Sequence, residues 1–213
     1  MTSLLFITAP QADHKQINRI LIHLRDYDYG DSEDDFFRLV TTKNAYDLDL
    51  STDSGSQEIT AYQCLEETSP PVPIDIENAW AGASLDDIEE YCADLARADV
   101  KGANPGLFVV IDAEGLREED CILVEEQYEW EERGTARFWK MRVPWDELYI
   151  TWCQLEVGNA SFEEMTEEVE ETNDEERRKE MSWFTFRTTC EDSGEGCPGR
   201  DAAIEELRKE GRA

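Results

Sequence analysis

Carboxylates are the side chains of this sequence that are numerous enough to carry chemistry. The chain has 51 Asp and Glu residues against 20 Lys and Arg residues, and its formal charge is -31 over 213 residues. Carboxylates act as general acids and bases in pairs, bind divalent cations, and form docking surfaces for basic proteins. The excess charge is screened if it is spread evenly over the surface, so only a local cluster of acids can steer a partner. With so many candidates, no two carboxylates are marked out as a catalytic pair.

The densest cluster of acids lies in residues 163–180, here called the acidic segment, which holds ten acids and three bases. Ser161 and Glu164 have the spacing of a capping box, which predicts a helix that begins at Phe162 and continues through the segment. Like charges recur there at i,i+4, and each such pair disfavours a helix by about 0.2–0.5 kcal/mol. The helix is therefore either solvated and frayed or completed by a cationic partner. The residues predicted to bind that partner are Glu163, Glu164, Glu167, Glu168, Glu171 and Glu175.

A small group of bases offers the acidic segment a counterpart within the same chain. Arg137, Lys140 and Arg142 are the sizeable basic group of an otherwise acidic sequence. We expect these bases to pair with the acidic segment. If these bases neutralise the carboxylates of the acidic segment, the segment does not need a basic partner from another protein.

Aromatic residues form a second candidate site. They are Trp139, Trp145, Tyr149 and Trp152. Trp is highly buried on average, which favours a place in the core, and the alternative is a small-molecule pocket or a partner anchor. Further along the chain, Trp183, Phe184 and Phe186 are too apolar for a free tail, and we expect them to dock on the body or on another chain.

Other catalytic and metal-binding patterns are not met by the sequence. His14 and His23 are the two histidines, and the cysteines lack ligand spacing, so we expect neither a zinc site nor a nucleophilic triad. His23 is predicted to be a structural imidazole. Glycine-rich phosphate loops and EF-hand loops do not match, and no metal or cofactor is expected. A loose divalent-cation site around Asp26, Asp28 and Asp31 stays open as an alternative.

The composition also limits partners and compartment. Nucleic acid and anionic membranes are not expected partners, because both would repel this chain. No apolar run reaches the ~20 residues of a membrane helix, and the apolar run at residues 4–7 falls short of a signal peptide. Six scattered cysteines show no disulfide framework. The sequence therefore predicts a cytoplasmic protein.

The elements that must position these residues follow from apolar patterns and caps. Residues 1–16 are expected to be a loose leader, and residues 17–24 a strand. A helix is expected after Ser32, and the clearest helix follows Ser84, which forms a capping-box pair with Asp87.

Buried strands are expected to follow that clearest helix. Residues 106–112 read as a strand buried on both faces, and residues 121–128 and 135–143 as a hairpin. The fold class is α/β, with a single mixed sheet of four to five strands, helices packed on it, and an acidic helical C-terminal extension. The expected core domain spans residues 17–168, and residues 169–213 hold the rest of the acidic helix, a linker and a short terminal helix.

Several stretches resemble a family of small acidic bacterial domains of unknown function. The resemblance rests on the strand at residues 107–112 that ends in Asp112, the pair Arg137-Phe138, and the pattern from Leu155 through Asn159 to Glu164. It covers about residues 17–168. It implies a single α/β domain and brings no assigned chemistry.

These patterns lead to two functional hypotheses. The first is an acidic interaction or regulatory protein, immunity-like or inhibitor-like, that binds a basic protein surface and is not an enzyme. The alternative is an enzyme or a small-molecule-binding accessory protein of a biosynthetic pathway, with an aromatic-lined pocket.

Overall fold

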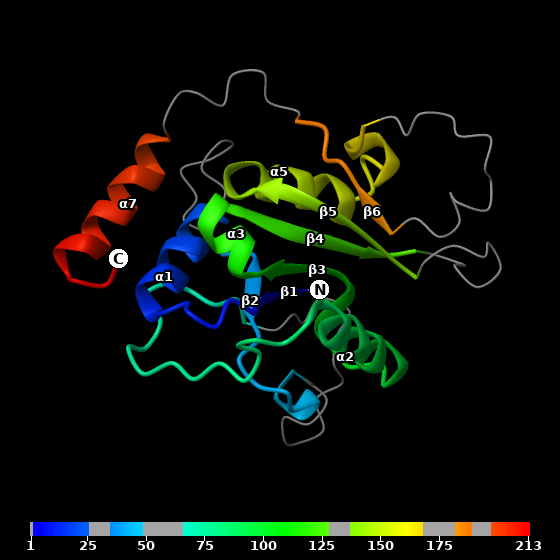
Figure 1. Cartoon of the computed structure of the whole chain (residues 1–213), viewed down its shortest axis with the longest axis horizontal. Coiled ribbons are helices and arrows are strands. Elements are labelled where there is room, and N and C mark those ends of the chain that lie inside the picture. The colour runs from blue at the N-terminus through cyan, green and yellow to red at the C-terminus, as the bar shows by residue number, and fades with distance from the viewer. Residues whose placement is uncertain (1, 26–34, 49–65, 128–136, 168–181, 189–196) are drawn as a thin grey trace.

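One mixed sheet organises the protein, as the α/β prediction requires (Figure 1). The computed structural model describes residues 2–25, 35–48, 66–127, 137–167, 182–188 and 197–213. The strands are β1 (Thr2–Ile7), β2 (Phe37–Leu39), β3 (Ala103–Ile111), β4 (Asp120–Glu126), β5 (Phe138–Pro144) and β6 (Trp183–Phe184). Their order is β2-β1-β3-β4-β5-β6, which is six strands where four or five were expected. The helices are α1 (His14–His23), α2 (Leu85–Arg97), α3 (Ala113–Glu118), α5 (Trp145–Glu156) and α7 (Pro198–Lys209), with short 3-10 turns η1 (Ala45–Leu48) and η3 (Glu163–Met165).

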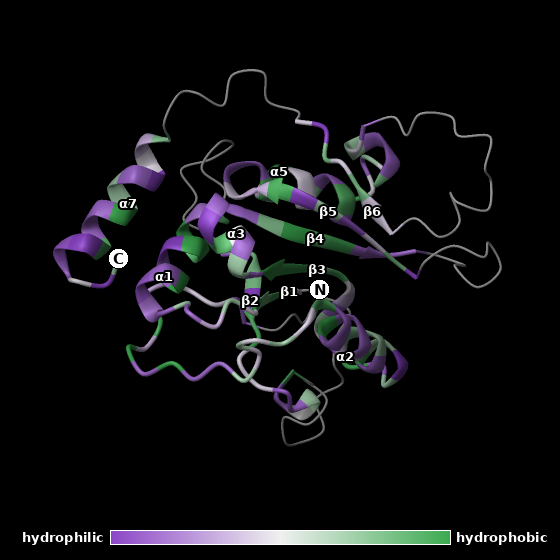
Figure 2. Cartoon of the chain, in the orientation of Figure 1, coloured by the Kyte–Doolittle hydropathy of each residue, from purple (hydrophilic) through white to green (hydrophobic). Residues whose placement is uncertain are grey.

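The sheet has a helical layer on each face. Strand β1 alternates between two cores: Leu5 and Ile7 pack with α1 and α5, whereas Leu4 and Phe6 pack with α2. In Figure 1, α5 and α2 accordingly lie on opposite sides of the sheet. Hydrophobic residues are concentrated on the central strands, and hydrophilic residues cover much of α2 and α7 (Figure 2).

Residues 2–7 form a central strand, so the prediction of a loose leader was wrong. β1 lies between β2 and β3 and runs parallel to both. All six of its residues are buried. A strand covered on both faces carries a continuous apolar run instead of an alternating one, and the run at residues 4–7 is that signal.

Residues 17–24, predicted as a strand, belong instead to α1 and its C-cap. Asp13 accepts hydrogen bonds from the N–H groups of Lys15 and Gln16, and the Gln16 side chain accepts one from the Asp13 N–H. This capping box starts a helix. A short apolar run fits a strand and a buried helix equally well, so the cap decides the structure.

The helix expected after Ser32 is also not found. Ser32 lies outside the described residues, and Phe37–Leu39 form β2, which pairs in parallel with β1. The segment around Thr68 pairs with the outer edge of this strand. The Thr68 N–H donates to the Phe37 carbonyl, and the Thr68 hydroxyl accepts from the Leu39 N–H. The pairing is a tertiary contact that local sequence does not reveal.

The elements predicted from strong local signals are confirmed. Ser84 and Asp87 form the expected capping box of α2. The buried strand is β3, and β4 and β5 pair antiparallel as the predicted hairpin. The short terminal helix is α7, whose Ile204 and Leu207 pack on Ile22 of α1.

The acidic helix predicted from Phe162 ends after one turn. The last residue of η3 is Met165, and the Thr166 backbone is already extended. Thr166 bridges Phe186 in antiparallel fashion, and the Glu167 N–H donates to the Thr185 carbonyl. Glu163 and Glu167 therefore do not share one helical face. Residues 168–181 lie outside the described residues.

Candidate functional site

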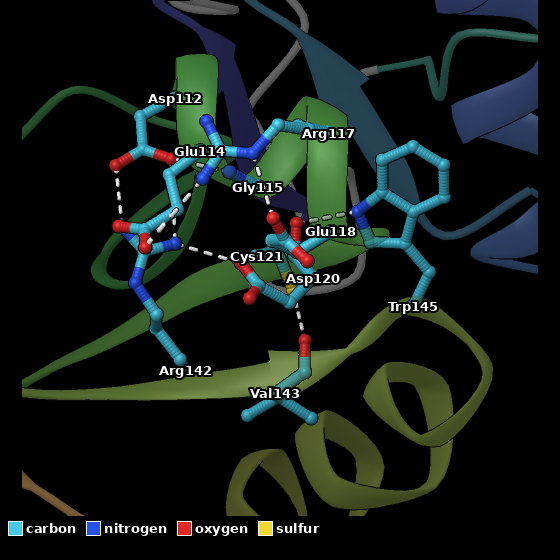
Figure 3. Close-up of polar contacts among 10 residues, drawn as sticks. All are labelled: Asp112, Glu114, Gly115, Arg117, Glu118, Asp120, Cys121, Arg142, Val143 and Trp145. Atoms are coloured by element: carbon cyan, nitrogen blue, oxygen red, sulfur yellow. Dashed lines mark hydrogen bonds and ion pairs between the residues drawn. The ribbon is translucent and has the colours of Figure 1, made fainter.

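Figure 3 shows a network of charged side chains around Arg142 of β5. Its guanidinium donates to Asp112 at 2.6 Å and to Asp120 at 2.7 Å. A third carboxylate, that of Glu114, lies 3.0 Å from the same group. Three acids on one base leave this cluster with a net negative charge.

Local structure explains why these acids meet. Asp112 caps α3 by accepting a 2.7 Å hydrogen bond from the Gly115 N–H. A Cβ on Gly115 would lie 2.5 Å from the Asp120 backbone oxygen, so only glycine permits this close approach. That same oxygen accepts the indole N–H of Trp145 at 2.6 Å. The Arg142 cluster thus joins the end of β3, α3, β4 and β5.

The electrostatics of the Arg142 cluster favour ion pairing over proton transfer. Burial raises the pKa of Asp112, but hydrogen bonds from Arg142 and from the Gly115 N–H outweigh it and hold the pKa below its usual value. Burial lowers the pKa of Arg142, and its bonds to Asp112 and Asp120 more than reverse this effect. A general acid or base needs a pKa near the working pH, which Asp112 does not have.

The three bases expected to neutralise the acidic segment form ion pairs with other acids. Arg137 lies 2.6 Å from Glu126 of β4, and Lys140 lies 2.7 Å from Glu89 of α2. Arg142 is held by the cluster described above. Lys140 and Glu89 are largely buried, so their pairing matters more than a surface contact would. These ion pairs join β5 to β4, to α2 and to the end of β3.

The described part of the acidic segment lies at the surface beside β6. Glu163, Glu164 and Glu167 are exposed. Glu164 completes the predicted capping box, because its carboxylate accepts the Ser161 N–H at 2.8 Å. This bond and one with the Ser161 hydroxyl lower the pKa of Glu164. The other predicted partner-binding residues, Glu168, Glu171 and Glu175, lie outside the described residues.

The four aromatic residues predicted to line a pocket do not line one common cavity among the described residues. Trp145 and Trp152 are buried in the core, and the Trp152 indole N–H donates to the Ser3 hydroxyl at 2.6 Å. Tyr149 stacks near Trp152 with ring centroids 6.2 Å apart. Trp139 packs elsewhere, with its ring centroid 4.9 Å from that of Phe184. The core interpretation therefore holds for Trp145 and Trp152.

An open groove beside β6 was not predicted from the sequence. It is lined by Arg142, Pro144, Trp183, Phe184, Thr185, Phe186 and Thr188. Its volume is about 460 Å³, and it is largely open to solvent. Phe184 and Phe186 pack on the core, as the expected docking of this stretch requires, whereas Trp183 stays 45% exposed. The apolar content of residues 183–186 was the available signal for this groove.

The remaining candidates are structural or lie outside the described residues. His23 ends α1, and burial, with help from Arg200 and Arg19, lowers its pKa to about 4. The imidazole is neutral and half-buried, which fits a structural role, but its buried Nε2 has no hydrogen-bond partner among the described residues, so the prediction holds only in part. Asp26, Asp28 and Asp31 fall outside the described residues. Over the described ranges, no three His, Cys, Asp or Glu side chains are grouped to hold a metal, and no helix is long and apolar enough to cross a membrane.

Comparison with known proteins adds no relative to this picture. No protein-family model matches the chain, and no significant match appears among curated proteins or solved structures. The resemblance to small acidic bacterial domains therefore stays a prediction.

Proposed function

We propose that this chain is a cytoplasmic interaction protein, of the immunity or inhibitor kind, that binds a basic protein surface. The binding region is the acidic segment where it joins the sheet beside β6. One observation carries the proposal: Arg137, Lys140 and Arg142 form ion pairs with Glu126, Glu89 and the acids of the Arg142 cluster. Each of these bases already has an acid partner outside the acidic segment.

The exposed position of these acids supports the proposal. Glu163, Glu164 and Glu167 lie at the surface and are close together in the sequence. A local excess of one sign steers an oppositely charged partner and raises its association rate, and salt weakens the effect. The Arg142 cluster is less suited to catalysis, because its carboxylates are held in ion pairs by Arg142.

The experiment compares two variants that remove the same number of charges. In the first, Glu167, Glu168, Glu171 and Glu175 are changed to Gln. In the second, four exposed acids of α7 and its cap are neutralised: Asp201→Asn, Glu205→Gln, Glu206→Gln and Glu210→Gln. The probe is a labelled arginine–glycine repeat peptide, whose affinity is measured by fluorescence anisotropy at low and high salt.

We expect the first variant to bind the peptide more weakly than the second at low salt. Equal affinities of the two variants would show that only total charge matters, and would overturn the proposal. Absence of peptide binding to the native chain at low salt would overturn it as well.

A further inference from the structure

The C-terminal helix α7 packs on α1 through a small apolar contact of its own. Ile204 and Leu207 of α7 meet Ile22 of α1, with Ala203 and Ala213 beside them. These residues form a cluster separate from the two cores that cover the faces of the sheet. Figure 1 shows α7 next to α1 at the periphery of the molecule. The helix therefore adds little to the burial that stabilises the sheet.

A ring of hydrogen bonds holds the chain that follows α7. The Asn18 side chain of α1, which is fully buried, accepts the Val72 N–H at 2.7 Å and donates to the Arg212 carbonyl at 2.8 Å. The Arg212 guanidinium donates to the Val72 carbonyl at 2.6 Å. Amides and guanidinium groups keep their charge between pH 5 and pH 7, so this ring is not a source of pH dependence.

The start of α7 lies near His23 of α1, where the polar contacts are incomplete. His23 Nε2 and Arg200 Nε are buried, and neither atom has a hydrogen-bond partner among the described residues. The imidazole also lies against the Trp145 indole of α5, with ring centroids 5.5 Å apart. A buried polar group without a partner destabilises the fold, and a charged one does so more strongly. This packing therefore tolerates a neutral imidazole better than a protonated one.

Charged side chains from four helices or their ends face this imidazole. Arg200 of α7 and Arg19 of α1 oppose its protonation, whereas Glu119 at the end of α3 and Asp146 of α5 favour it. Glu119 is itself paired with Arg19 at 2.6 Å. Burial and the two guanidinium groups prevail, and they lower the pKa of His23 to about 4. Release of α7 removes Arg200 and part of this burial, so the released form binds the proton more tightly.

We propose that α7 is a releasable helix, and that protonation of His23 in mildly acidic solution shifts it from docked on α1 to undocked. A proton that binds the undocked form more tightly drives the equilibrium toward that form. The effect begins near the ordinary imidazole pKa of about 6.5 and grows as the pH falls. Undocking uncovers Ile22, which is buried under α7. This regulation goes beyond the proposed function and does not depend on the acidic segment.

The test measures amide hydrogen exchange in the full chain by NMR at pH 7 and at pH 5. Protection factors correct for the pH dependence of the exchange reaction itself, and they report local opening. Those of α7 are compared with those of α2, which packs on the opposite face of the sheet. The variant is His23→Gln, which keeps a polar side chain that cannot be protonated. The matched control is His14→Gln, which changes the other histidine, at the first residue of α1.

We expect the protection of α7 relative to α2 to fall by about 5- to 20-fold from pH 7 to pH 5. The upper figure applies if release returns the pKa of His23 from about 4 to the ordinary value of about 6.5. His14→Gln should keep this fall, and His23→Gln should lose it. Unchanged relative protection in the native chain, or a fall that persists in the folded His23→Gln variant, would overturn the inference.

Arg200→Met keeps the test decisive if His23→Gln does not fold. The substitution removes the guanidinium of α7 that opposes protonation of His23. The pKa of His23, followed through its ring protons by NMR, should rise above the native value of about 4. An unchanged pKa in this variant would show that α7 does not control the proton, and the inference would fail.

Discussion

Replacing Arg142 with Met should expose how much the three-carboxylate network contributes to folding. The substitution keeps an unbranched apolar stem but leaves Asp112 and Asp120 without their cation. Removing one partner of a buried ion pair costs about 3–5 kcal/mol, and removing one from an exposed pair costs about 0–1 kcal/mol. The side chains of Arg142, Asp112 and Asp120 are 29%, 30% and 20% exposed, between these limits. We therefore expect the free energy of unfolding at about pH 7 to fall by about 2–3 kcal/mol.

The pH dependence of this loss identifies its cause. In the native chain the pKa of Asp112 is held low, so its contribution to stability is present above the ordinary carboxyl pKa of about 4 and is lost as the pH falls through the lowered value. Without Arg142, Asp112 loses the hydrogen bond and the attraction of the guanidinium, so its pKa is higher in the variant than in the native chain. The stability difference between the native chain and the variant should therefore be largest near pH 7 and shrink as the pH falls below about 4.

The assay is urea denaturation followed by tryptophan fluorescence at several pH values. The control is Arg117→Met, because the Arg117 side chain is 65% exposed and its pairs with Glu114 and Glu118 lie at the surface. That variant should lose much less stability than Arg142→Met at every pH, because its ion pairs are exposed to solvent. The reasoning fails if Arg142→Met costs as little as the control, or if its cost stays constant across the pH range.

Two further predictions concern the same region and the neighbouring helix. Gly115→Ala places a Cβ 2.5 Å from the backbone oxygen of Asp120, so we expect the free energy of unfolding, measured by urea denaturation, to fall by about 1–3 kcal/mol. The control is Gly106→Ala, whose new Cβ meets no atom closer than 3.6 Å, and it should cost less. Equal losses in the two variants would contradict this explanation. His23 should titrate near pH 4 in an NMR titration of its ring protons, because burial lowers its pKa to about 4. Since the unfolded chain binds that proton near pH 6.5, His23 should lower the free energy of unfolding as the pH falls from about 6.5 to about 4, and a midpoint near 6.5 in the folded chain would refute its burial.

Local signals in the sequence were sufficient for part of the fold. The capping box at Ser84 and the apolar run of β3 predicted elements that the structure confirms, because each depends on residues close together in the chain. The Ser161 box also forms, but only one 3-10 turn follows it instead of the predicted helix. The structure of residues 2–7 and 17–24 was predicted wrongly, because short apolar runs do not distinguish a loose end, a strand and a buried helix.

The rest depends on contacts between distant residues. The acidic helix ends at Met165 because Glu167 pairs with Thr185, a backbone contact that no local pattern announces. Arg142 finds its acids at the end of β3 and the start of β4, so its partners became visible only when the sheet was assembled. The groove could not be predicted either, because its walls come from β5 and from residues 183–188, which are distant in the sequence.

A salt-dependent comparison of two charge-matched variants tests the central claim most directly. The claim is that negative charge beside β6, and not negative charge in general, recruits a basic partner. At low ionic strength, the arginine–glycine peptide should bind the Glu167, Glu168, Glu171 and Glu175 variant with a larger dissociation constant than the α7 variant, and the two dissociation constants should converge as salt is raised. Indistinguishable dissociation constants at low salt would contradict the account.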